Sequence, residues 1–244
     1  MSLPIHLTIL TGASRGMGLA MAQQLLRPGQ QLLCLSRHSH LALTERAAAQ
    51  HAALEQWEQD LSQTRASAER LRAWLQAQPA GQFASATLIN NAGVIPPIAP
   101  LSSSAPGDLA QALRVGLEAP LLLCAAFLGA TEHWAIPRKV LNISSGLGRR
   151  AMASQAAYCA AKAGMDHFTR CLALDEALKP HGAKVCSLAP GVIDTAMQVQ
   201  LRSADAANFP DAPQFAQLKT AGHLSSAADA AASVLAWLER PDFG

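Results

Sequence analysis

Short apolar runs along this chain alternate with longer stretches whose apolar residues recur every three or four positions. A short apolar run is typical of a buried strand, and the longer spacing is typical of an amphipathic helix. The runs that predict strands are 6–10, 31–36, 54–60, 84–89, 139–144 and 183–189. The stretches that predict helices are 19–26, 62–78, 107–129, 155–178 and 226–238. Strands that alternate with helices in this way favour an α/β fold with a parallel sheet.

Two stretches of the chain show no clear period. Residues 39–53 are polar and rich in alanine, which predicts a loop with a helical turn. Residues 195–223 predict a long irregular segment, and such a segment in a compact domain is usually functional or mobile. We expect it to form a lid over a substrate, within a single domain that spans residues 1–244.

Composition and charge argue against several classes of protein. Of the 244 residues, 50% are hydrophobic, so disorder is not expected for the chain as a whole. The formal charge of +2, without a basic run, gives no support for nucleic-acid binding. Five cysteines without C-x-x-C spacing predict reduced thiols, and eight histidines without an H-E-x-x-H motif predict no metal site.

The N-terminus has no basic region before its apolar residues, as a signal peptide would have. The longest apolar run, 119–130, is shorter than the segment that a membrane-spanning helix needs. We therefore expect a cytoplasmic protein that does not enter a membrane.

The first predicted strand leads directly into a glycine-rich turn, Thr11-Gly-Ala-Ser-Arg-Gly-Met-Gly18, and a helix follows. Glycines allow the backbone to approach a pyrophosphate closely, and a helix N-terminus offers free N–H groups and a positive dipole end. An ordinary strand-to-helix turn is the alternative. Three glycines within seven residues favour a dinucleotide site.

The second predicted strand ends at Ser36-Arg37, without an acidic residue. In dinucleotide-binding folds an acidic residue at this point binds the ribose hydroxyls and repels a 2′-phosphate. Arg37, assisted by Arg15, can instead pair with that phosphate, so we expect NADP(H) rather than NAD. Both arginines can also be ordinary solvated surface residues.

Two further strands end in residues suited to a cofactor. Asp60 and Leu61 follow the third strand near the expected adenine, although Asp60 can equally cap a helix. Asn90-Asn91-Ala92-Gly93 follows the fourth strand, where small residues let the backbone lie against a ligand. A simple strand-to-loop turn is the alternative there.

Tyr158 and Lys162 are four residues apart on a predicted helix, so they lie on the same helix face. A free tyrosine has a pKa near 10, and a nearby lysine cation favours the phenolate and lowers that pKa. The pair is therefore a candidate acid–base unit, although many such pairs are only solvated surface residues. Ser145 stands thirteen residues upstream, at the end of an apolar run.

The motifs together resemble those of the short-chain dehydrogenase/reductase family. They are TGASRGMG (11–18), NNAG (90–93), Ser145, YCAAK (158–162) and PGVIDT (190–195), in the order and spacing of the family. The segments LINNAGVIPP, NISSG, AYCAAKAGMDHFTR and PGVIDTAMQ resemble the sepiapterin reductase and benzil reductase branch, whose members reduce carbonyls with NADPH. The resemblance implies a single Rossmann-type, doubly wound parallel sheet of six to seven strands with helices on both faces.

The resemblance also implies roles for individual residues. Tyr158 would donate a proton to the carbonyl oxygen, Lys162 would lower the Tyr158 pKa and hold the nicotinamide ribose, and Ser145 would hydrogen-bond the substrate oxygen. The residues expected to bind NADP(H) besides Tyr158 and Lys162 are Gly12, Ser14, Arg15, Gly16, Met17, Gly18, Ser36, Arg37, Asp60, Leu61, Asn91, Ala92, Gly93, Pro190, Gly191, Val192 and Thr195.

The chain departs from the family pattern at Gly116, where the family usually has an asparagine that helps to hold a water in the proton relay. Glycine offers no side-chain oxygen, so we expect reduced rather than absent activity. A catalytically weakened dinucleotide sensor or scaffold of the same fold is the alternative function. The family also usually has a strand after the last helix, and only Arg240-Pro-Asp-Phe-Gly244 stands there.

The expected partner is a small-molecule carbonyl substrate, an apolar or aromatic ketone or diketone. The helices predicted over 107–129 and 155–178 carry more apolar surface than one sheet face needs. In the family such helices pair between subunits, so we expect a homodimer or homotetramer. Packing of the whole surface within one subunit is the alternative.

Overall fold

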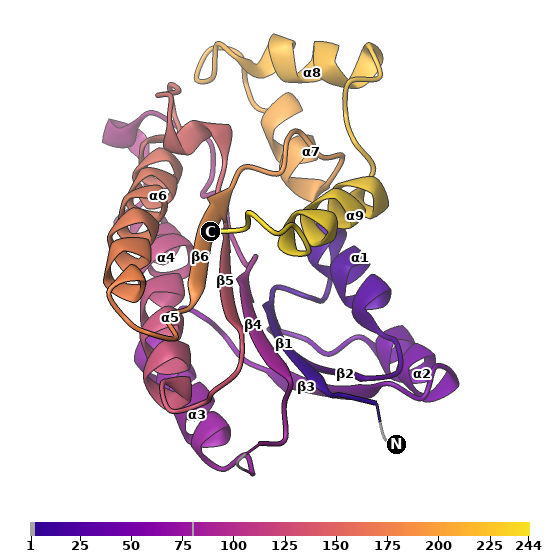
Figure 1. Ribbon diagram of the computed structural model, residues 1–244. Helices are drawn as coiled ribbons and strands as arrows, with labels where there is room; N and C mark the ends of the chain where they lie inside the picture. The colour runs from indigo at the N-terminus through magenta and orange to yellow at the C-terminus, as the bar shows by residue number, and fades with distance from the viewer. Residues whose placement is uncertain (1–2, 80) are drawn as a thin grey trace.

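The computed structural model describes residues 3–79 and 81–244, and it is built around one parallel sheet (Figure 1). The strands are β1 (His6–Thr11), β2 (Gln30–Ser36), β3 (Ala53–Glu58), β4 (Ser85–Asn90), β5 (Arg138–Ile143) and β6 (Lys184–Leu188). Their order across the sheet is β3-β2-β1-β4-β5-β6, and each neighbouring pair is parallel. This is the strand order of a doubly wound Rossmann sheet.

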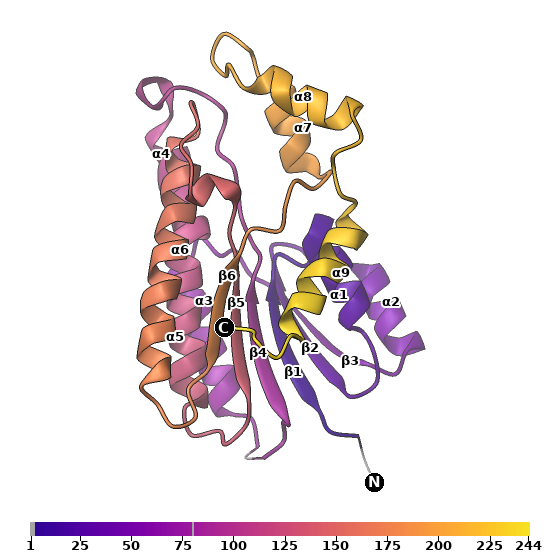
Figure 2. The same ribbon diagram turned by 45° about the horizontal axis from the view of Figure 1, so that its top comes forward.

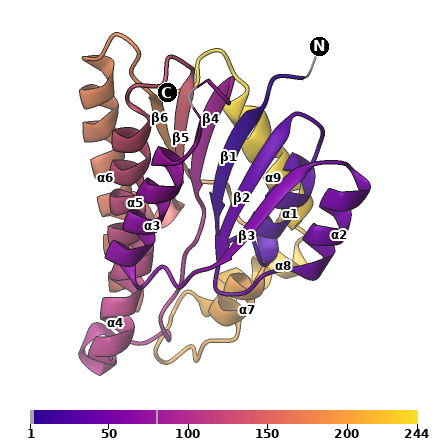
Figure 3. The ribbon, with the colours of Figure 1, turned by 90° about the horizontal axis from the view of Figure 1, so that it is seen from below.

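Helices cover both faces of the sheet (Figure 3). One face carries α1 (Gly16–Leu25), α2 (Leu41–Ala49) and α9 (Ala227–Leu238); the other carries α3 (Thr64–Gln76), α4 (Pro106–Leu113), α5 (Ala119–Thr131) and α6 (Ala156–Ala177). Successive residues of a strand point to opposite faces. Ile9 therefore packs in the core that includes α3 and α5, whereas Leu10 packs in the core that includes α1 and α9. The helix layers thus bury both faces of each central strand.

The sequence patterns located the strands closely. All six predicted strands are present, and their ends differ from the predicted ends by at most two residues. The prediction of a loop with one turn over residues 39–53 was wrong in part, because α2 occupies 41–49. Among the described residues no seventh strand follows α9, and the chain instead runs beside β6, with Gly244 against Lys184.

The long helix predicted over 107–129 is formed by α4, a π-helical stretch (Arg114–Glu118) and α5 in direct succession. Contrary to the expectation from the run 119–130, the combined helix Pro106–Thr131 is long and apolar enough to cross a membrane by length and composition alone. An 18-residue window within it has a mean hydropathy of 1.6. A core helix meets the same criterion, and 56% of this apolar window is buried inside the protein. Leu123 and Phe127 pack against the sheet in the core beside α3.

Residues 195–223 contain two short helices, α7 (Ala196–Arg202) and α8 (Ala212–Thr220), so the prediction of an irregular segment was wrong. Both helices lie beyond the ends of the sheet strands, apart from the main layers (Figure 2). They have a small core of their own, in which the rings of Phe209 and Phe215 stack at 5.7 Å. Helices of seven and nine residues are too short for their apolar spacing to be recognised in sequence.

Candidate active site

A cavity of about 550 Å³ lies at the carboxyl ends of the strands, bordered on one side by α7 and α8. In open parallel sheets, ligands bind at this edge, where the strand order reverses between β1 and β4. Every residue that the sequence predicts for the site lines this cavity, from Gly12 in the first turn to Thr195 at the start of α7. The topology therefore brings together residues that are far apart along the chain.

The glycine turn after β1 is packed so closely that side chains would not fit. Gly12 has a φ of +73°, and a Cβ there would lie 2.9 Å from the Cα of Ala92. A Cβ at Gly18 would lie 2.1 Å from the carbonyl oxygen of Gly12. The helix α1 begins within this turn, so its first N–H groups point towards the cavity edge. Contacts within the protein therefore require glycine at Gly12 and Gly18.

Neighbouring polar side chains hold the turn in place. Asn91 Nδ2 donates to the carbonyl oxygen of Thr11 at 3.0 Å, and the Thr11 hydroxyl accepts from the backbone N–H groups of Asn91 and Ala92. The Ser36 hydroxyl accepts from the N–H of Ala13 at 3.0 Å. The side chains of Asn91 and Ser36 therefore shape the cavity through the turn, a function that the sequence alone did not reveal.

Charged residues border the end of the cavity near β2 and β3. Arg15 and Arg37 are exposed, and neither forms an ion pair with any residue that the structure describes. Asp60 Oδ1 accepts from the N–H of Ser62 at 2.9 Å, so this carboxylate stabilises the turn before α3. Two cations without an ion-pair partner among the described residues therefore stand at this end of the cavity.

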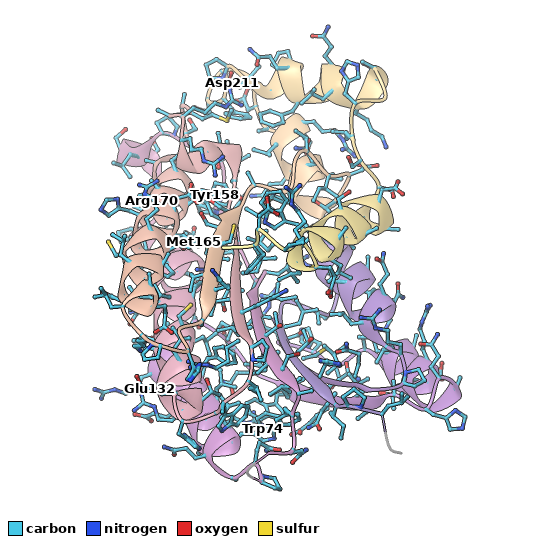
Figure 4. The ribbon with its side chains drawn as sticks, viewed as in Figure 1. Trp74, Glu132, Tyr158, Met165, Arg170 and Asp211 are labelled. Carbon is cyan, nitrogen blue, oxygen red and sulfur yellow. The ribbon has the colours of Figure 1, made fainter. Side chains whose placement is uncertain are left out.

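Ser145, Tyr158 and Lys162 meet at the other end of the cavity, near β5 and α6. Figure 4 shows Tyr158 near the start of α6, with Met165 two turns further along. Tyr158 is 7% exposed and Lys162 is 3% exposed. Lys162 Nζ donates to the carbonyl oxygen of Ile143 at 2.7 Å and lies 5.9 Å from the centre of the Tyr158 ring. The pair is therefore buried rather than a solvated surface pair.

Burial dominates the acid–base properties of this pair. It raises the pKa of the Tyr158 phenol above its ordinary value, and the Ser145 hydroxyl opposes part of that shift. Burial also lowers the pKa of Lys162 to about 8, and the negative charge of Asp166 opposes the lowering. The sequence led us to expect that Lys162 lowers the Tyr158 pKa; in the structure that pKa is instead raised, because desolvation outweighs the Ser145 hydrogen bond.

Asp166 is a residue of this region that sequence reasoning missed. It lies one helical turn beyond Lys162 and is 4% exposed, with Arg149 Nε 3.6 Å from its Oδ2. The spacing of 158, 162 and 166 at intervals of four was the available signal, because such residues share one helix face. Within residues 3–79 and 81–244, no group of three or more His, Cys, Asp or Glu side chains is arranged to hold a metal.

Mainly apolar residues border the cavity beside Tyr158. The Met197 sulfur lies 3.9 Å from the Tyr158 hydroxyl. The further lining residues here that sequence reasoning missed are Val94, Ile95, Gln111, Leu147, Arg150, Gln198, Leu201 and Phe215. Met197 and Gln198 belong to the segment PGVIDTAMQ, so their position after the Thr195 motif was the available signal. The arrangement suits a ligand with apolar groups beside a proton donor.

Comparison with known proteins gives a family and several relatives. The family model described as short chain dehydrogenase matches residues 6–206. The chain is 32% identical over 235 residues to a benzil reductase ((S)-benzoin forming) from Bacillus cereus, covering 96% of this chain and 94% of that protein. It is 33% identical over 201 residues to sepiapterin reductase from Xenopus laevis, covering 78% and 74%.

Solved structures resemble the whole chain. The KRED1-Pglu enzyme is 26% identical with a TM-score of 0.81, and the match covers 97% of both chains. A putative NAD(P) dependent gluconate 5-dehydrogenase from Beutenbergia cavernae, with bound NADP at low occupancy, is 27% identical with a TM-score of 0.79. That match covers 96% of this chain and 89% of the other. The likeness therefore extends over both helix layers and the sheet.

Proposed function

Because this chain belongs to the short-chain dehydrogenase family, we propose that it catalyses the NADPH-dependent reduction of a ketone or diketone to an alcohol. One observation carries the proposal: Ser145, Tyr158 and Lys162 line the same cavity as the glycine turn after β1. A dinucleotide that lies along the turn would reach the tyrosine–lysine pair.

The residues around the cavity fit a nicotinamide dinucleotide. The turn from Gly12 to Gly18 lines the cavity and leads into the N-terminus of α1, whose free N–H groups suit a pyrophosphate. The opposite border, from Pro190 to Val192 and at Thr195, would hold the nicotinamide end. When bound, NADPH supplies the hydride, and the protein supplies binding, orientation and charge.

The catalytic roles follow from positions in the cavity. The Tyr158 hydroxyl donates a proton to the substrate oxygen as a hydride reaches the carbonyl carbon. Ser145 hydrogen-bonds the same oxygen while negative charge develops on it. Lys162, held by the carbonyl of Ile143, keeps a positive charge close to the phenol and favours its ionised form once the proton has left.

The preference for NADP(H) over NAD rests on Arg37, with Arg15 beside it. Both are exposed cations at the end of the cavity where the adenosine ribose would lie, without an ion-pair partner among the described residues. Guanidinium groups bind phosphate through two parallel hydrogen bonds. Among similar structures, the Beutenbergia cavernae protein was determined with NADP, and a Brucella melitensis reductase was determined with NAD.

Several further features remain part of the proposal. We infer that the chain forms a single domain, with residues 195–223 as a lid, and acts in the cytoplasm as a homodimer or homotetramer. The outward side of α6 supports subunit pairing, because Leu174 in α6 and Leu178 directly after it are 71% and 86% exposed. The surface between subunits would then cover leucines that water otherwise contacts.

The first test is NADPH oxidation with a panel of ketones, diketones and pterin-like carbonyls, with NADH in parallel. We expect turnover with NADPH, and we expect Tyr158→Phe to bind NADPH normally but to lose turnover. Unchanged turnover in this variant would refute the assigned proton donor. NADPH binding without turnover of any carbonyl would favour the alternative function, a dinucleotide sensor or scaffold. Gly116 is the feature of the sequence that supports this alternative.

A further inference from the structure

A second cavity lies at the other end of the strands from the candidate active site. It has a volume of about 490 Å³ and lies between the amino-terminal halves of β1, β4 and β5 and the helices α1 and α9. These two helices lie side by side on one face of the sheet (Figure 3). Among the described residues none lines both cavities, and the second volume is in the range of small-molecule sites.

The floor of this second cavity is polar, although the central strands of a parallel sheet are normally apolar on both faces. Thr8, Thr87 and Lys139 are register neighbours on β1, β4 and β5. A strand spacing of about 4.8 Å therefore places these three side chains in one row across the sheet, the polar row. His6 and Ser85 stand beside it towards the amino ends, with His6 Nδ1 2.7 Å from Ser85 Oγ. All five residues line the cavity.

Strand alternation places the polar row on the face that α1 and α9 cover. Leu10, Ile89 and Leu141 stand two residues further along β1, β4 and β5, and they pack in the core that includes those helices. The polar row therefore continues the apolar core of this face towards the amino ends of the strands. Ala232 and Ala236, one turn apart on α9, also line the cavity, so small side chains border the space above the row.

Two cations, Lys139 and Arg27, border the second cavity. Lys139 Nζ donates to the carbonyl oxygen of Leu238 at the end of α9, which uses one of its three N–H groups. Neither cation forms an ion pair with any residue that the structure describes. Glu239 is the carboxylate among the described lining residues, so two positive charges stand against one negative charge. The balance of charge therefore favours an anion.

We propose that the second cavity binds a small anionic molecule through a phosphate or carboxylate group. Lys139 and Arg27 supply the positive charge, and ammonium and guanidinium groups bind such oxygens by charge-assisted hydrogen bonds. The hydroxyls of Thr8, Ser85 and Thr87 can donate to the same oxygens or pair with hydroxyl groups of the ligand. The site is independent of the proposed reductase function, because its ligand would lie at the other end of the strands from the dinucleotide.

Isothermal titration calorimetry of the unaltered protein and its variants tests the site with inorganic phosphate, acetate and the neutral triol glycerol. Thr87→Val removes one hydroxyl at nearly constant shape, and Lys139→Gln removes one charge. Lys184→Gln is the matched control, because Lys184 is an exposed lysine of β6 outside this cavity. Arg37→Ala is measured as well, because phosphate can also bind near the glycine turn of the first cavity.

We expect phosphate, acetate or both to bind, and glycerol not to bind. Thr87→Val and Lys139→Gln should each weaken anion binding by about tenfold or more, as for loss of a hydrogen bond to a charged group. Lys184→Gln and Arg37→Ala should leave the affinity of the second cavity unchanged. Far-UV circular dichroism checks folding, and Thr87→Val still tests the site if Lys139→Gln does not fold. Binding of only one anion would identify the ligand group as phosphate or as carboxylate.

Three results would overturn the assignment of this second site. The first is that neither anion binds. The second is that glycerol binds as tightly as the anions, because the cavity would then recognise hydroxyl groups without regard to charge. The third is anion binding that Thr87→Val and Lys139→Gln leave unchanged, because the anion would then lie elsewhere, and a loss in Arg37→Ala would place it in the first cavity. A protein without NADPH turnover would leave all these results as they are, so the two proposals fail separately.

Discussion

A Cβ atom added at Gly116 would lie 3.0 Å from the Cβ of Ala161, which stands between Tyr158 and Lys162 on α6. Gly116 lies in the π-helical stretch between α4 and α5, and this stretch packs closely against α6 in the same helix layer. Such a distance is shorter than ordinary van der Waals contact, so one of the helices must shift to accept a side chain. The glycine thus has a packing role besides lacking the asparagine oxygen.

Replacing Gly116 alone with the asparagine common in the family should therefore destabilise the protein. We expect Gly116→Asn to lower the free energy of unfolding by about 1–3 kcal/mol, because the new side chain crowds the contact with Ala161. Gly116→Asn combined with Ala161→Gly should recover part of the loss. Chemical denaturation of the unaltered protein, Gly116→Asn and the double variant measures these free energies. A Gly116→Asn variant as stable as the unaltered protein would contradict the prediction.

Asp194 connects the two lid helices. Its carboxylate forms ion pairs with Arg202 Nη1 at 3.3 Å, at the end of α7, and with Lys219 Nζ at 2.5 Å, in α8. These partners lower the pKa of Asp194, with the Lys219 hydrogen bond as the largest cause. The ion pairs should therefore persist above the unfolded-state pKa of the carboxyl and be lost as the pH falls through its lower folded-state value.

Asp194→Asn should consequently loosen the lid. We expect a higher KM for the carbonyl substrate with little change in melting temperature, because partly exposed ion pairs contribute little to global stability. Asp211→Asn is the control, since Asp211 lies in the same lid and has no ion pair among the described residues. Equal KM values for the unaltered protein, Asp194→Asn and Asp211→Asn would mean that the ion pairs do not affect substrate access.

Tyr158 is the only tyrosine in the chain, so its ionisation can be measured directly. Burial raises its pKa above the ordinary value, and Ser145 counteracts part of the shift. The absorbance of tyrosinate near 295 nm should therefore rise only above about pH 10 in the ligand-free protein. Ser145→Ala should move the rise to still higher pH, and a shift to lower pH would contradict the assigned contact.

The lowered pKa of Lys162, which lies beside Tyr158, predicts that activity falls at alkaline pH. Lys162 has a pKa of about 8, lowered by burial and supported by Asp166. If the charged form is needed, kcat/KM should fall as the pH rises through about 8, because the free enzyme then loses this proton. Asp166→Asn removes the supporting negative charge, so the fall should move to lower pH.

Asp175→Asn is the matched control for that pH profile. Asp175 lies on the same helix, α6, but its side chain is exposed, and water screens its charge. Its removal should leave the midpoint of the alkaline fall in place. The same midpoint of the alkaline fall in the unaltered protein, Asp166→Asn and Asp175→Asn would show that Asp166 does not influence Lys162 during turnover.

The strands and the cavity edge could be predicted because local sequence determines them. All the strands except the more polar β3 are short apolar runs that end in small or polar residues, and parallel pairing brings those ends to one edge. The glycine turn was evident for the same reason, since three glycines fall within seven residues between a strand and a helix. The predicted residues lie together because the topology requires it.

Other features depend on contacts between distant segments, which no local pattern records. The π-helical stretch at Gly116 reflects contact with Ala161, forty-five residues away. The raised pKa of Tyr158 depends on burial under Met197 and its neighbours rather than on the spacing to Lys162. Gln198 resembled any polar residue of a short helix until its burial in the cavity wall was known.

Arg37 provides the sharpest test of cofactor preference, because it follows β2 at the position where an acidic residue would favour NAD. Arg37→Ala should reduce the ratio of kcat/KM for NADPH to that for NADH by about 10- to 100-fold, the range expected for loss of a charge-assisted hydrogen bond. The value for NADH should change little, since only NADPH carries the 2′-phosphate. Arg15→Ala should give a smaller effect. Arg27→Ala should give none, because Arg27 is an exposed arginine outside this cavity.

An unchanged ratio in Arg37→Ala would mean that the phosphate is bound elsewhere or that the enzyme does not select NADP(H). A parallel loss with both cofactors would instead indicate that Arg37 contacts the adenosine that they share.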